Sequence, residues 1–489
     1  MASNGKEAYD VKGELEESEN ITPKTTNNYV ESGIDLEYEK KLMRKIDWRL
    51  LPILGVLYSA ALIDRSNVSS AGVAGMKNDL KLFIGERNSI VLLIFFVPYF
   101  IFELPSNILL RKVGAAKWLG TIALLWGAVM ISMGFVNDWR VLVFCRAVLG
   151  FFESGFFPGC VYLISSWYVR YEVQKRMAGF YLVSVLVGGF SSILAYYIMK
   201  MEGVQGLRSW RWIFIIEGAL TCGGALLAYF LITDFPDKLL ERSRKQFLTA
   251  DDVALVKARI DRDRDDSQAD DLTMQKVLKH LSDWKLWVYA MMYMCSTAPS
   301  YAFPYFMPYL LQSMGYDAKT IQLLSAPPYV SAVTIAFGFA WASDRTRLRG
   351  PFIVAGSVLI VIGLSMTAYH PNNSIRYLGI FIGLAGAQAN VPTILTYQAN
   401  NIRTNSKRSV GSALQIGFGA IGGIYASTVF REKDFPKYVN GLWATIATQF
   451  LLLILVGVMS LYFKKKNRQH AEGKLSEPLE GHENFTYAL

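Results

Sequence analysis

LLPILGVLYSAALIDRSNVSSA, residues 50–71, begins as an apolar run and ends with polar and charged side chains. A helix of about 20 apolar residues crosses the hydrocarbon core of a bilayer. Asp64 and Arg65 interrupt the run side by side, and Asn67 follows two positions later. Because a charged side chain inside a bilayer costs about 3 kcal/mol or more, such residues usually have a partner or a function. We therefore expect a membrane span that carries a polar site.

The composition is that of a membrane protein. Of the 489 residues, 52% are hydrophobic and only 18% are charged. The formal net charge is +10, but Lys and Arg stand in short clusters between apolar runs, which favours lipid headgroups over nucleic acid as their partners. The polar N-terminus lacks the apolar core of a cleavable signal peptide. We expect neither a disulfide framework nor a metal site, because the cysteines lie in apolar segments without metal-ligand spacing: Cys145, Cys160, Cys222 and Cys295.

Runs of about 20 apolar residues predict twelve spans. Their approximate limits are 49–66, 89–110, 117–136, 140–162, 176–199, 211–233, 285–312, 321–342, 351–369, 376–397, 410–430 and 441–463. A hydrophilic stretch with a helix start at Thr249 separates two sets of six. The predicted organisation is a disordered tail (1–45), a first six-helix bundle (46–233), a central loop (234–283), a second bundle (284–463) and a C-terminal tail (464–489).

The short loops predict the orientation and a repeat. Lys and Arg are more numerous on the side that holds both termini and the central loop, so these parts are expected in the cytosol. LRKVGAAKW follows the second span and SDRTRLRG follows the eighth, each as a basic turn that contains glycine. Six plus six spans with matching loops indicate a repeat-built transporter whose site lies between the halves.

Apart from Lys or Arg at the first position of a predicted span, the charged residues inside the spans lie in the first half only: Asp64, Arg65, Glu103, Arg146, Glu153 and Glu217. Arg146 and Glu153 are seven positions apart in RAVLGFFESGFFPG, which places both side chains on one helix face, about 10 Å apart along the axis. Two arginines facing a cavity suit an anion, because guanidinium binds carboxylate bidentately. No histidine lies in a span, so any proton coupling would rest on carboxylates.

Each of these residues also has a structural interpretation. Asp64 and Arg65 could cap the end of a span, and Arg146 and Glu153 could form an internal ion pair. Glu103 and Glu217 fit a structural role better than a functional one. The second half offers polar and aromatic candidates for ligand contacts, each of which could instead be a helix-packing partner: Tyr301, Gln388, Asn390 and Tyr397. Tyr301 lies in APSYAFPYFMP, where the prolines predict a broken span. The sequence has no phosphate loop, nucleophile elbow, HExxH motif or paired CxxC, so it supports neither ATP hydrolysis nor enzyme chemistry.

Five segments together resemble the major facilitator superfamily: IDRSN in the first span, FELPSNILLRKVG after the second, RAVLGFFESGFFPG in the fourth, RWIFIIEG in the sixth and SAPPY in the eighth. More narrowly, they resemble the anion:cation symporter family in its fungal, allantoate-permease-like branch. The resemblance covers about residues 45–463. It implies an all-α membrane protein of twelve transmembrane helices in two pseudo-symmetric six-helix bundles.

The resemblance also implies a function, the proton-coupled import of a small organic anion by alternating access. Asp64 and Glu153 would serve proton coupling, and Arg65 and Arg146 would bind the substrate, a carboxylate such as nicotinate, pantothenate or allantoate. Asn67 would join the substrate site with the second-half candidates. The expected partners are the anion, protons and the lipid bilayer, and we expect no cofactor and no nucleic acid. A monomer in the plasma membrane is the expected form.

Two departures from the family pattern concern the substrate and not the fold. Ala420 stands in GFGAIGG where an Asn is expected before the glycine pair, and Tyr397 stands where many relatives carry Trp. Two rival functions remain at this point. The same fold supports a proton-coupled exporter of drugs or metabolites, and a nutrient sensor would bind a ligand without transporting it.

Overall fold

A computed structural model describes residues 36–236, 247–264, 274–346, 348–402, 404–434, 438–474, 478–481 and 485–488. The chain divides into two units, residues 1–50 and 51–489. Within the first unit, the described residues form the beginning of helix α3 (Leu36–Ala71). Residues 36–45, which the sequence predicts to belong to a disordered tail, are helical. The rest of that tail lies outside the described residues.

Helix α3 continues beyond the predicted limit of the first span at residue 66. It ends at Ala71 and passes into a π-helical turn, η1 (Gly72–Met76), and the short helix α4 (Lys77–Asp79). The apolar count stopped early because Asp64 and Asn67 are polar, yet both side chains are buried and face the protein interior. The polar stretch therefore lies inside the last two turns of a helix that continues to Ala71.

The remaining helices of the first half are α5 (Arg87–Leu93), α6 (Phe96–Val113), α7 (Ala115–Met133), α8 (Trp139–Glu153), α9 (Phe156–Trp167), α10 (Arg170–Ile198) and α11 (Ser209–Leu231). Helices α8 and α9 together form the predicted fourth span. Large apolar side chains on the outer surface suit contact with lipid: Phe144 is 68% exposed and Phe230 is 77% exposed.

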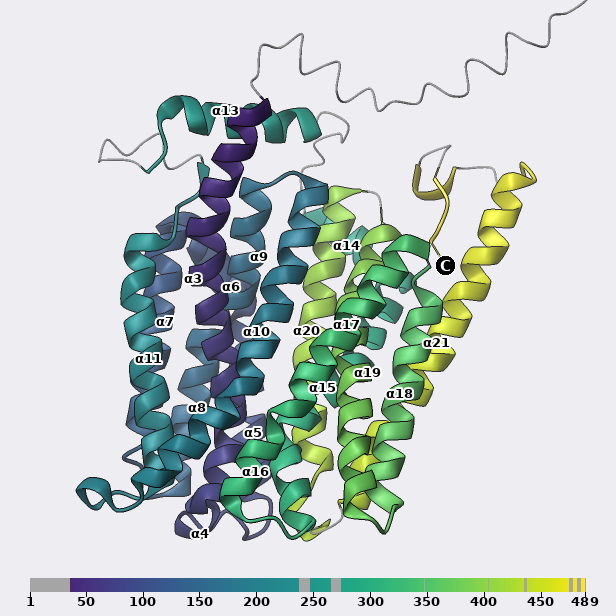
Figure 1. Cartoon of the computed structure of the whole chain (residues 1–489). Helices are drawn as coiled ribbons and strands as arrows, with labels where there is room; N and C mark the ends of the chain where they lie inside the picture. Colours follow the sequence, from purple (N-terminus) through teal and green to yellow (C-terminus); the bar gives the residue numbers. More distant parts are fainter. Residues whose placement is uncertain are drawn as a thin grey trace, which may run out of the picture. The chain divides into compact units, whose positions relative to one another are not determined.

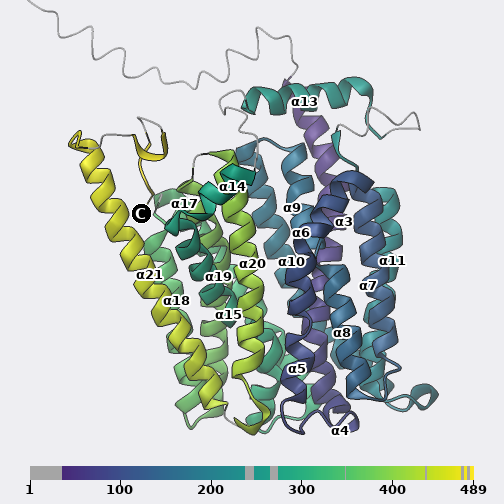
Figure 2. The same ribbon diagram turned by 180° about the vertical axis from the view of Figure 1, so that it is seen from behind.

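The second half contains α15 (Trp284–Ser313), α16 (Ala318–Ser325), α17 (Pro327–Thr346), α18 (Gly350–Tyr369), α19 (Asn373–Asn400), α20 (Asn405–Val429) and α21 (Val439–Ala471). Proline was expected to break the span that holds Tyr301, but α15 is one continuous helix with Pro299, Pro304 and Pro308 inside it. Figure 1 shows α7 and α11 at one side, α18 and α21 at the opposite side, and α10 and α20 between them, and Figure 2 shows the same order from behind.

Nine helices in the described part of the chain are long and apolar enough to cross a membrane, and a tenth candidate is formed by Arg87–Glu103 and Pro105–Val113, which meet at a bend of 54°. Helices α15 and α20 have 30 and 25 residues, which is also sufficient length. These helices correspond in order to the twelve predicted spans. Between the halves, α13 (Ala250–Arg264) and α14 (Met274–Leu281) occupy the central segment. Thr249 begins α13 as predicted, because its Oγ1 accepts from the Asp252 N–H at 3.2 Å and the Asp252 carboxylate accepts from the Thr249 N–H at 2.9 Å.

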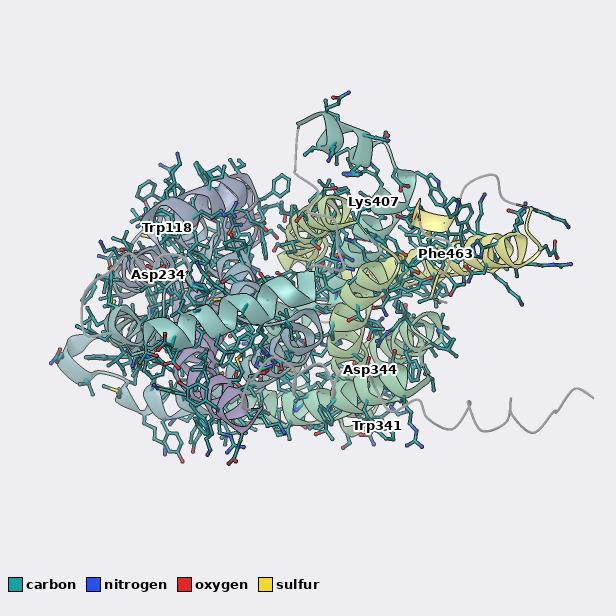
Figure 3. All side chains as sticks on the ribbon, turned by 90° about the horizontal axis from the view of Figure 1, so that it is seen from above. Trp118, Asp234, Trp341, Asp344, Lys407 and Phe463 are labelled. Atoms are coloured by element: carbon teal, nitrogen blue, oxygen red, sulfur yellow. The ribbon has the colours of Figure 1, made fainter. Side chains whose placement is uncertain are left out.

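Carboxylates stabilise the two basic turns that have similar sequences. In the first turn, Gly114 has a φ of 103° and Asp234 Oδ1 accepts from the following Ala115 N–H at 2.8 Å. In the second turn, Arg349 Nη2 lies 2.5 Å from Asp344 Oδ1. Figure 3 labels Asp234 and Asp344 in different halves of the molecule. The two similar segments therefore form turns that are stabilised in different ways.

The C-terminal segment packs against the ends of second-half helices. Glu480 Oε1 lies 2.6 Å from Lys285 Nζ of α15 and 2.9 Å from Lys407 Nζ of α20. The Tyr487 ring stacks on Phe463 of α21 with a centroid separation of 4.3 Å. Figure 3 shows the labelled Lys407 and Phe463 near each other at this end of the molecule. Polar and aromatic contacts together bind the C-terminal segment to α15, α20 and α21.

Candidate functional site

Arg65 of α3 and Glu153 of α8 form a buried ion pair. Arg65 Nε and Nη2 both donate to Glu153 Oε1, at 2.8 and 2.5 Å. The two residues are 7% and 1% exposed. The Arg65 guanidinium also donates to the Tyr301 hydroxyl at 3.3 Å and lies 5.3 Å from the ring centre of Tyr99. The charge of Arg65 is therefore neutralised within the protein, and the Glu153 Oε2 atom has no hydrogen-bond partner among the described residues.

Gly150 of α8 and Gly155, which precedes α9, allow this part of the chain to approach Phe95 and Ser106 at α6 closely. A Cβ on Gly150 would lie 2.1 Å from the Phe95 carbonyl oxygen, and a Cβ on Gly155 would lie 1.7 Å from Ser106 Oγ. Both glycines belong to the segment RAVLGFFESGFFPG. The spacing of this motif is therefore a packing requirement that brings Glu153 to the interior.

Arg146 is not paired with Glu153, although both belong to α8 and the sequence analysis kept such a pair as an alternative. Its side chain is fully buried, and Nε donates to the Val91 carbonyl oxygen at a long 3.4 Å. Its Nη1 and Nη2 atoms have no hydrogen-bond partner among the described residues. The guanidinium carbon lies 4.9 Å from the Phe95 ring centre. Four N–H groups of a buried cation thus remain available for an anion.

Tyr301 and Tyr305 of α15 bring the second half of the chain to the arginines. The Tyr301 hydroxyl accepts the hydrogen bond from Arg65, and the two tyrosine rings are stacked with centroids 6.4 Å apart. Tyr305 is fully buried, its hydroxyl has no hydrogen-bond partner among the described residues, and it interacts electrostatically with Arg146. Sequence reasoning predicted Tyr301 and missed Tyr305. The four-residue spacing in APSYAFPYFMP places the two on one helix face and could have identified it.

Asp64 and Asn67 lie together on another face of α3. Asn67 Nδ2 is 3.5 Å from Asp64 Oδ1, and the residues are 2% and 1% exposed. The Asp64 Oδ2 atom has no hydrogen-bond partner among the described residues. Arg65 and Asp64 are adjacent in sequence, so their side chains point to different sides of the helix. Asn67 was predicted to bind substrate, and the structure groups it with the carboxylates of the first half.

The candidates on α19 occupy three different environments. Gln388 Oε1 accepts from the Tyr181 hydroxyl of α10 at 3.1 Å, which links the two halves. Asn390 is fully buried against α18. There its amide nitrogen donates to the Ile353 carbonyl oxygen, and its amide oxygen accepts from Ser357. Tyr397 is also fully buried, among aromatic rings of the second half such as Tyr289 at 5.5 Å. Direct substrate contact by these three residues stays a prediction.

Aromatic side chains cover the site on both sides along α3. Towards the start of the helix, Tyr58 stacks on Phe157 and Phe180, each at 5.0 Å. Towards its end, Gly72 approaches Tyr309 so closely that a Cβ would clash with the Tyr309 hydroxyl. This arrangement encloses Arg65 and Arg146, which agrees with their exposure of 7% and 0%. A cavity of about 430 Å³ lies elsewhere, against α10, α16 and α17, and its lining is almost entirely apolar.

Comparison with known proteins identifies the family of this chain. Residues 54–427 match the family model described as Major Facilitator Superfamily. The MFS transporter prlL of Fungal sp. (strain NRRL 50135) is 30% identical over 94% of this chain and 93% of its own length. The MFS-type transporter cnsO of Penicillium expansum is 29% identical over 89% of this chain and 85% of its own length.

Solved structures share the fold at low sequence identity. The xylose transporter XylE from E. coli, in a partially occluded inward-open conformation, has a TM-score of 0.65 at 12% identity, over 85% of this chain and 99% of its own. A bacterial homolog of the human lysosomal transporter Spinster has a TM-score of 0.63 at 14% identity, over 84% of this chain and 96% of its own. The twelve-helix fold predicted from the sequence is confirmed. The chain belongs to the major facilitator superfamily, and it is therefore a multi-pass membrane transporter and not an enzyme.

Proposed function

We propose that this protein imports a small organic anion, a carboxylate, together with protons, as a member of the anion:cation symporter family. One observation carries the proposal: Arg146 is a fully buried cation whose Nη1 and Nη2 atoms have no hydrogen-bond partner among the described residues. An unpaired buried charge is costly. A carboxylate bound bidentately to these two nitrogens would neutralise the charge and use the free donors.

The neighbours of Arg146 favour an anion that is partly flat and apolar. The Phe95 ring lies beside the guanidinium, and the stacked rings of Tyr301 and Tyr305 face the same region. Aromatic walls suit a flat ring, and the free Tyr305 hydroxyl can hydrogen-bond to a polar substituent. Among the substrate types considered, an aromatic carboxylate such as nicotinate fits this environment better than pantothenate or allantoate.

The Arg65–Glu153 pair supports a coupling mechanism. Protonation of Glu153 would remove the charge that holds Arg65, because the neutral acid no longer attracts the guanidinium. Arg65 would then join Arg146 at the substrate, and loss of the proton would restore the ion pair and expel the anion. Asp64 would be the second titrating carboxylate. In this proposal both termini face the cytosol, and the protein works as a monomer in the plasma membrane.

A thermal-shift comparison of purified full-length protein tests the proposal, since a ligand bound only to the folded state raises stability. We expect nicotinate to stabilise the protein more at about pH 5 than at about pH 7, and its uncharged amide to have no effect. Pantothenate and allantoate would be tested in parallel. Stabilisation by cations or neutral lipophiles alone would overturn the proposal in favour of an exporter, and binding without net flux in proteoliposomes would indicate a sensor.

A further inference from the structure

The cavity of about 430 Å³ is an open groove at the junction of the two halves. Its walls are formed by Phe190 and Ile193 of α10, in the first half, and by residues of α16 and α17, in the second half, among them Leu323 and Val330. Phe190, Leu323 and Val330 are 46%, 41% and 43% exposed, so the groove opens on the outer surface. Its volume lies in the range of small-molecule sites, about 300–1,000 Å³.

Two features of the backbone shape the groove. At Gly189, α10 and α17 cross so closely that a Cβ would lie 2.4 Å from Tyr329 Cβ. On the other side, α16 ends at Ser325 and α17 begins at Pro327, because proline has no N–H with which to continue the helical hydrogen bonds. The groove lies between this close crossing and this helix break. It is therefore fixed by the course of the chain and not by the rotamer of one side chain.

The groove suits hydrocarbon better than a polar ligand. It lies within two segments that are long and apolar enough to span a membrane, Gly179–Met201 and Ala318–Thr346. The Ser331 hydroxyl in its lining already donates to the Pro328 carbonyl oxygen at 2.9 Å. A carboxylate needs polar partners that this lining does not offer, whereas an acyl chain needs none. The groove is therefore distinct in chemistry from the site around the arginines.

Two lysines lie beyond one end of the groove. Tyr197 and Lys200 follow Ile193 by four and seven positions, which places them on the same side of α10 and of the 3₁₀ turn after it, up to about 10 Å further along the axis. Lys319 precedes Leu323 by four positions on α16, or about 6 Å. Both lysines are exposed, and Lys200 Nζ lies 4.8 Å from the Tyr197 ring centre. Figure 1 shows α16 at the end of the bundle opposite to α13.

An apolar groove with cations beyond one end matches the shape and charge of a phospholipid. Tyrosine and lysine at the end of a span are typical of the level of the lipid headgroups. An acyl chain in the groove would bring its phosphate to this level, where Lys200 and Lys319 complement a negative charge. A sterol would fill the groove without using either cation, so the two lysines favour an anionic lipid.

We propose that the groove is a binding site for one anionic phospholipid, with an acyl chain between α10 and α17 and the phosphate held by Lys200 and Lys319. The bound lipid contacts both halves of the transporter and joins them on the side that faces the bilayer. The site does not include Arg146 or its neighbours, and the proposal does not depend on the substrate or on proton coupling.

Native mass spectrometry of delipidated, full-length protein tests the groove. Phosphatidylglycerol and phosphatidylcholine with the same acyl chains are the probes. We expect wild type to retain one phosphatidylglycerol in preference to phosphatidylcholine. Ile193→Trp should lose this lipid, because the indole fills the groove, whereas Leu226→Trp, which adds the same bulk to an exposed position of α11, should retain it. If Ile193→Trp does not fold, Val330→Trp fills the groove from α17. Retention by the groove variant equal to that of wild type would overturn the proposal.

The headgroup contacts are tested with Lys200→Gln and Lys319→Gln. Each change should reduce the preference for phosphatidylglycerol over phosphatidylcholine about fivefold, since each removes one cation near the membrane surface. Lys433→Gln, which changes an exposed lysine outside the groove, is the control. Thermal unfolding is the second readout, and phosphatidylglycerol should raise the melting temperature of wild type more than that of Ile193→Trp. A preference unaltered in both lysine variants, or stabilisation by a sterol in place of phosphatidylglycerol, would refute the anionic lipid.

Discussion

The two halves of the molecule bury different kinds of polar group. In the first half, the charged residues Arg146, Glu217 and Asp64 are buried with atoms that lack hydrogen-bond partners in the described structure. In the second half, buried polar side chains are mainly neutral amides and hydroxyls. Gln449 is an example: its Nε2 donates to the Cys295 carbonyl oxygen at 2.8 Å and to Thr448 at 3.1 Å, while its Oε1 lacks a partner among the described residues.

This contrast separates residues that can bind ions or protons from residues that stabilise helix packing. Unsatisfied charges are costly in a membrane and are retained where they bind ions or protons. Neutral groups bonded to backbone carbonyls stiffen helix packing without any need for a ligand. The first half therefore holds the groups that can change charge state, and the second half contributes a rigid wall through Tyr301 and Tyr305.

The largest effect should come from Arg146→Lys. A lysine cannot reproduce a bidentate contact, and losing charge-assisted hydrogen bonds worth about 1.5–3 kcal/mol should weaken carboxylate binding about 10- to 100-fold. Titration calorimetry with nicotinate measures the change. Arg140→Lys is the matched control, because Arg140 is exposed on the same helix and its replacement should leave the affinity unaltered. Equal affinity in both variants would show that Arg146 is structural.

Glu153→Gln should abolish uptake driven by a pH gradient and spare exchange of substrate across the membrane. The neutral amide cannot cycle a proton, and Arg65 loses its counter-charge permanently. Proteoliposome uptake and counterflow assays separate the two activities. Glu86→Gln, which changes an exposed acid at the start of α5, is the control. A Glu153→Gln protein that still concentrates substrate would refute the coupling role.

Gly72→Ala should slow transport by hindering closure at the end of α3. The added methyl group collides with the Tyr309 hydroxyl, whereas Lys77 Nζ lies 3.6 Å from the centre of the same ring and holds it in place. Removing the hydroxyl with Tyr309→Phe should restore part of the rate in the double variant. Transport rates of the two single variants and the double variant measure this coupling. Strictly additive effects would exclude the contact as the cause.

Gln449→Leu should lower stability and leave anion affinity unchanged, in contrast to the arginine variant. Hydrogen bonds between helices in a membrane contribute about 0.6 kcal/mol on average, so we expect a small decrease in melting temperature. Thermal unfolding with and without nicotinate measures both quantities. A weakened affinity would show that the second half takes part in binding through more than its tyrosines.

The smallest expected effect is the release of the C-terminal segment at acid pH. Burial opposes ionisation of Glu480, but the ammonium groups of Lys285 and Lys407 outweigh it, so the pKa of this carboxyl is below its usual value. Docking of the tail is therefore fully stabilised above the usual glutamate pKa of about 4.3 and is lost as the pH falls through the lower value in the docked state. Hydrogen exchange at Tyr487 measures release. Glu480→Gln should release the tail at neutral pH, and protection unaffected by this change would assign docking to the aromatic stack alone.

The sequence predicted the spans well because hydropathy is a local property. All twelve predicted spans coincide with helices, and the Thr249 helix start is confirmed by its capping bonds. The limit of the first span was wrong because an apolar count cannot tell a polar residue that faces lipid from one that faces the protein. The sequence also predicted a helix break at the prolines of α15, and this was wrong because the helix continues through them.

By itself, the sequence determined the number of spans and the presence of two arginines and four acids within the first six, since both follow from residue type and position. Only the tertiary structure decided their partners. It pairs Glu153 with Arg65, leaves Arg146 Nη1 and Nη2 without a partner among the described residues, and brings Tyr305 to the site by stacking it on Tyr301. The reason is physical: the interaction of two side chains on different helices depends on the rotation and depth of each helix, which packing fixes and residue spacing along one helix does not.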